Sequence, residues 1–223
     1  MVGLSALHAA AFVRSPSRGR QAACAALGWA LLFVLFVSPL CALASALFSA
    51  RIAHHALMIA VVAPLLVLGW PCRPIFKGAS PGAIAALAVL HAAVLWSWHA
   101  PSAYGAALSN TTVYWVMELT LLGTALLLWQ VLLSPWAHLS VVMVALVGTA
   151  TQMALLGALI TFAPAPLYEP HLLTTEPWGL TALQDQQLAG LIMWIPASLP
   201  YVVVGLALVF RRFLAPAWAP RSS

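Results

Sequence analysis

The chain alternates between long apolar runs and short polar segments. Six runs have roughly 18 residues or more, enough to cross a hydrocarbon core of about 30 Å as a helix rising 1.5 Å per residue. They cover residues 23–46, 52–70, 82–99, 112–133, 138–162 and 186–210. The alternating segments of about ten residues that build membrane β-barrels do not occur in the sequence. The pattern therefore predicts an all-α, polytopic integral membrane bundle of six transmembrane helices.

Composition agrees with a membrane protein and fixes the domain organisation. Hydrophobic residues make up 64% of the chain and charged residues 6%, whereas roughly a quarter of a soluble domain is charged. We expect one transmembrane domain over 23–212, between an N-terminal segment 1–22 and a tail 213–223. The stretch Ala-Leu-Ala-Ser-Ala at 42–46 also resembles a signal-peptide cleavage site, but the apolar run before it is long for a signal peptide.

The basic residues are distributed unevenly between the two sides of this topology. Arg51 falls on one side, and the other eight of the nine Lys and Arg residues fall on the opposite side. These eight are Arg14, Arg18, Arg20, Arg73, Lys77, Arg211, Arg212 and Arg221. The positive-inside rule then places both termini in the cytoplasm, and we expect the chain to be a multi-pass protein of the plasma (inner) membrane. The pI of 9.6 thus reflects topology and contact with membrane lipids, and no nucleic-acid partner is expected.

Prolines interrupt two of the predicted helices. Pro64 removes a backbone donor from the second helix and should bend it, because the carbonyl of Ala60 loses its usual partner. Pro196 and Pro200 lie one turn apart in the last helix. Both helices are therefore expected to deviate from straight geometry.

The polar residues of four helices fall at one membrane level. His54 and His55 begin the second helix, His99 ends the third, Glu118 lies about two turns into the fourth, and Asp185 begins the sixth. An acidic side chain at the membrane centre costs roughly 2.5–3.5 kcal/mol, and less near an interface. We therefore expect Glu118 to face the bundle, near a donor from another helix.

Imidazoles and carboxylates at one level indicate a metal site. Together they suit a borderline divalent ion, imidazole also suits copper, and Met58 and Met193 lie deeper as thioether ligands for Cu(I). Each His is equally explained as an interfacial residue with a hydrated polar tip. His91, in mid-span, is expected to be neutral and bonded to a neighbouring helix. The three cysteines, at 24, 41 and 72, form no CxxC pair, so a thiolate cage is not supported.

Three stretches resemble a known family. They are HHALMIAVVAPLLVLGWP at 54–71, WHAPSAYGAAL at 98–108 and DQQLAGLIMWIP at 185–196. Over about residues 50–212 the chain resembles the CtaG family of polytopic membrane proteins, which is linked to assembly of haem-copper cytochrome c oxidase. The resemblance implies a non-enzymatic assembly factor that works with oxidase subunits and handles copper on the extracytoplasmic side.

The resemblance also implies which residues matter. His55, His99 and Asp185 would be the characteristic polar positions, with His54 and Glu118 as further ligands or supporting groups. The chain departs from the family in two places: Arg51 stands where members often have a His, and the neighbours of Glu118 are not a His-rich segment. Members often have seven helices. Two alternatives stay open, an accessory or structural oxidase subunit that binds no metal, and a small-solute or ion transporter.

Overall fold

The computed structural model describes residues 18–70 and 78–214, and this part of the chain contains helices and no strand. Within these described ranges six helical segments are long and apolar enough to cross a membrane, which confirms the predicted architecture. These segments are Gly19–Val37, Phe48–Leu68, Pro81–His99, Thr111–Leu132, Leu139–Thr161 and Ala182–Leu214. Arg14, Arg73, Lys77 and Arg221, which contribute to the predicted orientation, lie outside the described residues.

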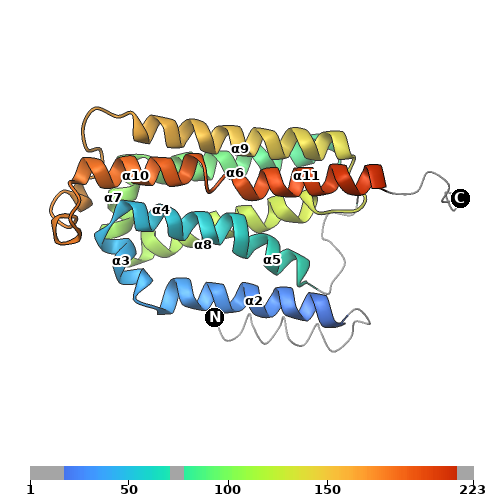
Figure 1. Ribbon diagram of the computed structural model, residues 1–223, viewed down its shortest axis with the longest axis horizontal. Helices are drawn as coiled ribbons and strands as arrows, with labels where there is room; N and C mark the ends of the chain where they lie inside the picture. Colours follow the sequence, from blue (N-terminus) through green and yellow to red (C-terminus); the bar gives the residue numbers. More distant parts are fainter. Residues whose placement is uncertain (1–17, 71–77, 215–223) are drawn as a thin grey trace, which may run out of the picture.

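The elements follow one another along the chain as shown in Figure 1. The N-terminal half contains α2 (Arg18–Val37), α3 (Leu40–Ala46), α4 (Phe48–Leu57), the π-helical turn η1 (Met58–Val62), α5 (Ala63–Leu68), α6 (Pro81–His99) and α7 (Pro101–Ser109). The C-terminal half contains α8 (Thr111–Leu132), α9 (Leu139–Thr161), the short 3₁₀ turns η2 (Glu169–His171) and η3 (Glu176–Trp178), α10 (Ala182–Trp194) and α11 (Leu199–Leu214).

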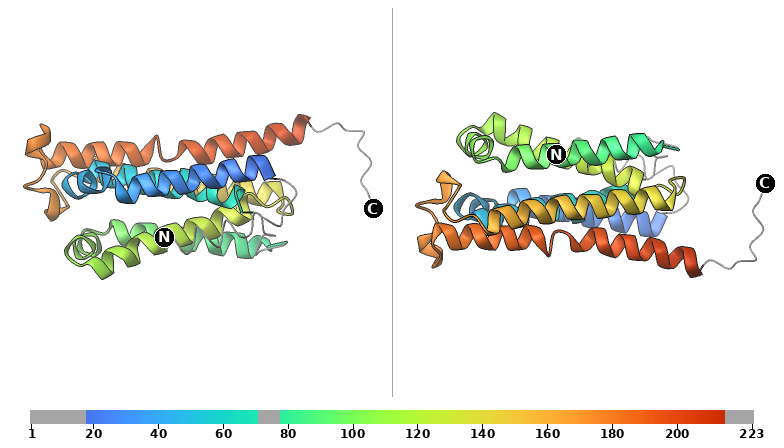
Figure 2. Two further views of the ribbon diagram at one scale, coloured as in Figure 1. Left: turned by 90° about the horizontal axis from the view of Figure 1, so that it is seen from below. Right: turned by 90° about the horizontal axis from the view of Figure 1, so that it is seen from above.

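The helices form an elongated bundle. Figure 2 shows α10 and α11 on one outer side and α6 with α8 on the other, with α2, α4 and α5 between them. Helix α10 packs against α9 and α4, α6 against α8 and α9, and α2 against α5. The short helices α3 and α7 and the segment 163–181 gather at the same end, which we call the loop end of the bundle.

The start of the bundle corrects two sequence predictions. The first apolar run, 23–46, is not one helix, because the chain turns at Ser38 and Pro39 between α2 and α3. The second spanning helix starts at Phe48 instead of residue 52, so Arg51 lies inside it and is only 2% exposed. In the sequence an apolar run ends at a charged residue, so the prediction places Arg51 outside the helix. In the fold, Glu118 compensates the charge of Arg51.

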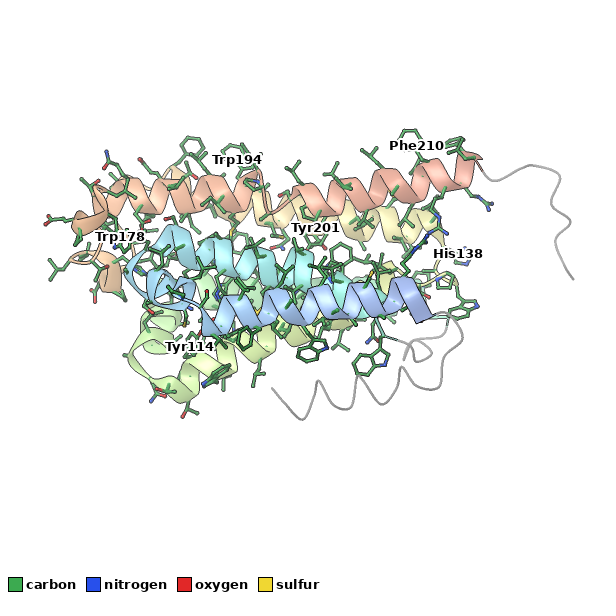
Figure 3. The ribbon with its side chains drawn as sticks, turned by 60° about the horizontal axis from the view of Figure 1, so that its bottom comes forward. Tyr114, His138, Trp178, Trp194, Tyr201 and Phe210 are labelled. Carbon is green, nitrogen blue, oxygen red and sulfur yellow. The ribbon has the colours of Figure 1, made fainter. Side chains whose placement is uncertain are left out.

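The second spanning helix absorbs Pro64 through a π-helical turn. In η1 the Ala63 N–H donates to the carbonyl of Met58, five residues earlier, and Pro64 has no N–H to offer the carbonyl of Ile59. The Trp129 indole of α8 fills that gap with a hydrogen bond of 2.8 Å to the Ile59 carbonyl. Tyr201 of α11, labelled in Figure 3, stacks on the Trp129 ring with the centroids 5.0 Å apart. The proline is thus accommodated by a side chain from a neighbouring helix.

The last spanning segment is broken, as its two prolines predict. Helix α10 ends at Trp194 and α11 begins at Leu199, and the Ala197 N–H reaches back five residues to the carbonyl of Ile192. Close to this break α10 approaches α9 at two glycines. A Cβ on Gly157 would lie 2.7 Å from the Gly190 carbonyl oxygen. Glycine at these two positions is therefore needed for the tight α9–α10 contact.

Two helix caps complete the loop end. Asn110 caps α8 by accepting from the N–H groups of Thr112 and Val113, so the helix itself begins at Thr111. Thr181 and Gln184 form a capping box at the start of α10. Both helices consequently begin at fixed positions beside the polar layer, which is the membrane level that holds His54, His55, His99, Glu118 and Asp185.

Candidate functional site

A buried ion pair lies at the centre of the polar layer. Arg51 Nη1 of α4 lies 3.3 Å from Glu118 Oε1 of α8, and their side chains are 2% and 1% exposed. Arg51 also donates from Nε to the Ala44 carbonyl and stacks over the Tyr114 ring at 5.2 Å; Tyr114 is labelled in Figure 3. Glu118 thus faces the bundle beside a donor from another helix, which confirms the prediction.

Both histidines of α4 point toward the same carboxylate. His55 Nε2 lies 3.2 Å from Glu118 Oε1, and His54 Nε2 lies 3.6 Å from Glu118 Oε2. A carboxylate paired with arginine can only accept hydrogen bonds. His55 therefore donates from Nε2, and its Nδ1 carries the lone pair.

His55 lies next to His99, the last residue of α6. The centroids of the two rings are 6.2 Å apart, with the ring planes at 76°. His99 Nδ1 bonds the Leu95 carbonyl at 2.6 Å, so Nδ1 is the donor and Nε2 carries the lone pair. Within residues 18–70 and 78–214, neither His55 Nδ1 nor His99 Nε2 has a hydrogen-bond partner, although both atoms are buried. Two unprotonated imidazole nitrogens are thus left unsatisfied on adjacent rings.

Asp185 lies at the start of α10 and binds the start of α4. Its carboxylate accepts from the Phe48 N–H at 2.6 Å, from the Ser49 N–H at 3.2 Å and from the Ser49 hydroxyl. The first turn of a helix presents unpaired N–H groups and a partial positive charge. A carboxylate 137 positions away in the chain therefore caps α4, and both of its oxygens are engaged there rather than with His55 or His99.

The segment 163–181 is tied down over the loop end. His171 donates from Nδ1 to the Ala46 carbonyl at 3.1 Å and accepts at Nε2 from the Tyr104 hydroxyl at 2.7 Å. The Tyr168 hydroxyl donates to the His99 carbonyl at 2.9 Å. Burial lowers the pKa of His171 and raises the pKa of Tyr104 and Tyr168. The segment therefore covers the His99 end of the site through a neutral imidazole.

Sequence reasoning did not assign roles to this second network. Tyr104 belongs to the stretch 98–108, and His171 stands next to Pro170 in the longest loop. Gln186, beside Asp185, also holds the segment, because its side-chain oxygen accepts from the Leu167 N–H at 2.7 Å. The burial of His171 and its hydrogen bonds to Tyr104 and to the Ala46 carbonyl depend on how the loop folds back over the bundle. The amino-acid sequence shows only that a His and a Tyr are present.

The remaining predicted groups have separate environments. His91 Nδ1 bonds Thr124 Oγ1 of α8 at 2.9 Å, as expected of a mid-span His held by a neighbouring helix. Met58 and Met193 are buried, Cys24 and Cys41 are free thiols, and Cys72 lies outside the described residues. In the described ranges no three His, Cys, Asp or Glu side chains are grouped as a metal site of three or more ligands.

Comparison with known proteins identifies the family. No curated protein and no solved structure matches the chain. The family model described as cytochrome c oxidase caa3 assembly factor (Caa3_CtaG) matches residues 2–214, which extends the resemblance beyond residues 50–212 to nearly the whole sequence. The six membrane-spanning segments and the polar residues of the stretches at 54–71, 98–108 and 185–196 all lie within the match. The chain therefore belongs to the caa3-type cytochrome c oxidase assembly factors, a family of CtaG proteins.

Proposed function

We propose that this protein assists assembly of a haem-copper cytochrome c oxidase by holding one Cu(I) ion between His55 and His99 and passing it to an oxidase subunit. The family supports the assembly role. The copper role rests on one observation, the two unsatisfied imidazole nitrogens on adjacent buried rings. In this proposal copper is cargo that enters and leaves, and the protein performs no catalysis.

The spacing of the rings supports a two-ligand site. A metal–imidazole bond of about 2 Å places the ring centroid roughly 3 Å from the metal. Two imidazoles on opposite sides of one ion then have centroids about 6 Å apart, and the centroids of His55 and His99 are 6.2 Å apart. Cu(I) has a filled d shell and accepts two ligands in a linear arrangement. A pair of neutral imidazoles fits that ion better than it fits Zn²⁺, which usually takes four ligands.

The surrounding groups favour delivery. The Glu118 carboxylate fixes His55 with its proton on Nε2, and the Leu95 carbonyl fixes His99 with its proton on Nδ1. Outer partners of this kind set the tautomer of ligating imidazoles. A two-ligand site can also release its ion to a partner that offers more ligands. The loop end would face the extracytoplasmic side, as the distribution of Lys and Arg predicts.

The test is Cu(I) binding to the purified full-length protein. Under anaerobic conditions, with a chromophoric Cu(I) chelator as competitor, the wild-type protein should retain one Cu(I) per chain. His55→Ala and His99→Ala should each lose it. The matched control is His91→Ala, which removes another buried imidazole of α6, one that bonds Thr124, and should leave copper binding unchanged. X-ray absorption should report two nitrogen ligands.

A cellular experiment separates the proposal from the accessory-subunit alternative. Under copper limitation, His99→Ala should lower oxidase activity, and added copper should partly restore it. If the variant lacking both rings gives normal oxidase copper content, the copper proposal is wrong. If the purified protein binds no Cu(I) while deletion of the chain still prevents oxidase assembly, the accessory role is favoured instead.

A further inference from the structure

A buried arginine lies one helical turn from His55. Arg51 and His55 are four positions apart on α4, a spacing that places their side chains on one face of the helix. Arg51 is only 2% exposed, and a guanidinium group is always charged in proteins. The imidazole that would receive a metal cation therefore has a permanent cation beside it.

Contacts from two neighbouring helices fix the position of this charge. Arg51 donates from Nε to the Ala44 carbonyl of α3 at 3.1 Å, and from Nη1 to the Tyr114 hydroxyl at 3.4 Å and to Glu118 Oε1 at 3.3 Å. The Tyr114 ring, labelled in Figure 3, has its centroid 5.2 Å from the guanidinium carbon. The charge is therefore held in place when an ion enters the site.

The Arg51 charge balances the carboxylate that contacts His55. Glu118 Oε1 lies 3.2 Å from His55 Nε2. A metal bound across the ring at Nδ1, with a bond of about 2 Å, would lie about 7 Å from the carboxylate and roughly 10 Å from the guanidinium group. Asp185 is bonded to the first turn of α4, whose partial positive charge offsets its own. The Arg51–Glu118 pair thus leaves no net charge beside the two imidazoles.

Charge balance discriminates between ions of different charge. With an effective dielectric constant of about 20, removing one positive charge roughly 10 Å away raises the affinity for a monovalent ion about tenfold. For a divalent ion the interaction energy doubles, so the affinity rises about a hundredfold. Without Arg51, the unbalanced Glu118 carboxylate would therefore favour divalent over monovalent ions at the histidines.

Stability alone explains this ion pair poorly. A buried pair loses in desolvation about as much as it gains in attraction, and well-packed apolar side chains often replace such a pair without loss. An arginine inside a membrane-spanning segment is costly as well. An effect on the neighbouring imidazole site explains why a charged pair lies here rather than an apolar one.

We propose that Arg51 determines the metal specificity of the His55–His99 site. By cancelling the charge of Glu118, it leaves two neutral imidazoles that accept Cu(I) and reject divalent ions such as Zn²⁺. Arg51 is not a ligand and acts through its electric field on the bound ion. This inference rests on the proposed copper role, to which it adds the class of ion that the site excludes.

The experiment compares Cu(I) and Zn²⁺ binding to the purified full-length protein, with a chromophoric chelator competing for each ion. Arg51→Gln removes the charge, and the glutamine amide can still donate a hydrogen bond to Glu118. The affinity for Zn²⁺ relative to Cu(I) should rise about tenfold in this variant. The double variant Arg51→Gln/Glu118→Gln removes both charges and should return this ratio to within about threefold of the wild type.

Further variants link the change to the charge and to the site. Arg51→Lys keeps the positive charge and should keep the wild-type preference for Cu(I). Adding His99→Ala to Arg51→Gln should abolish the Zn²⁺ binding that was gained. Adding His91→Ala instead, which removes the imidazole bonded to Thr124, should not. A purely structural role for Arg51 predicts weaker binding of both ions and no gain of Zn²⁺ binding.

The outcomes separate this inference from the copper role. If the wild type binds no Cu(I), the copper role fails and the specificity role fails with it. If Arg51→Gln keeps the wild-type preference for Cu(I), or if the double variant shifts as much as Arg51→Gln, only the specificity role of Arg51 is wrong. If Arg51→Gln does not fold, the wild type decides, because equal affinity for Zn²⁺ and Cu(I) at the two histidines would overturn the proposal and rejection of Zn²⁺ would support it.

Discussion

Replacing Asp185 tests whether this residue holds the fold together or holds a metal. In the structure its carboxylate caps α4 and leaves no oxygen directed to His55 or His99. Asp185→Ala removes the acceptor of two buried backbone N–H groups. Each unsatisfied buried donor costs about 1–3 kcal/mol, so the free energy of unfolding should fall by about 2–6 kcal/mol.

Asp185→Asn refines the estimate. The asparagine amide oxygen can still accept one of the two hydrogen bonds, and asparagine is itself a favourable helix cap. Asp185→Asn should therefore lower the free energy of unfolding by about half as much as Asp185→Ala does, or by about 1–3 kcal/mol. The conservative variant separates the loss of charge from the loss of the acceptor.

The assay is unfolding in mixed micelles titrated with a denaturing detergent and followed by tryptophan fluorescence. The control is Gln187→Ala on the same helix, a partly exposed position that should change stability by no more than about 0.5 kcal/mol. Cu(I) bound per folded molecule should be the same in all variants. The capping argument is refuted if Asp185→Ala unfolds with the wild-type midpoint. If that variant also loses Cu(I) binding, Asp185 is a metal ligand and not a cap.

Three further predictions follow from the buried contacts. Glu118→Ala leaves the Arg51 charge buried without a partner and should cost about 3–5 kcal/mol in the same unfolding assay, while the double variant Arg51→Met/Glu118→Leu should cost clearly less; the reverse order would contradict the ion pair. Because burial lowers the pKa of His171, the native state takes up fewer protons than the unfolded state, so local stability is present above about pH 6.5 and lost as pH falls below it. The protection factors of the amide hydrogens in the loop that carries His171 should fall accordingly as pH is lowered, and His171→Gln should lose this pH dependence. Gly157→Leu should separate α9 from α10 and cost about 1–3 kcal/mol or more, whereas Gly148→Leu, with open space around it, should unfold like the wild type.

The membrane-spanning architecture is readable from the sequence because lipid imposes a strict rule on composition. Each span must be apolar and helical, so five of the six predicted spans begin and end within about four residues of the observed ones. The exceptions have physical causes. The break at Pro39 is short and apolar on both sides, and the segment containing Arg51 is excluded by its charge although the partner, Glu118, is supplied by another helix.

The candidate site is only partly readable from the sequence. Depth along each helix places His55, His99 and Glu118 at one level, and the structure brings them together. The depth of a residue along its helix does not show which way its side chain points, however. Asp185 shares the level but binds the start of α4, and the Tyr104–His171 pair depends on a loop whose course has no periodic pattern. Only the packed bundle shows that Asp185 caps a helix.

The Arg51–Glu118 pair also constrains how the protein is made. Arg51 belongs to the second spanning segment and Glu118 to the fourth, which leaves the ribosome later. Until then the second segment carries an unbalanced charge, whose cost at the membrane centre is roughly 2.5–3.5 kcal/mol and lower near the surface. We therefore expect stable insertion of the second segment to depend on the arrival of α8, so that the charge pair couples insertion to folding.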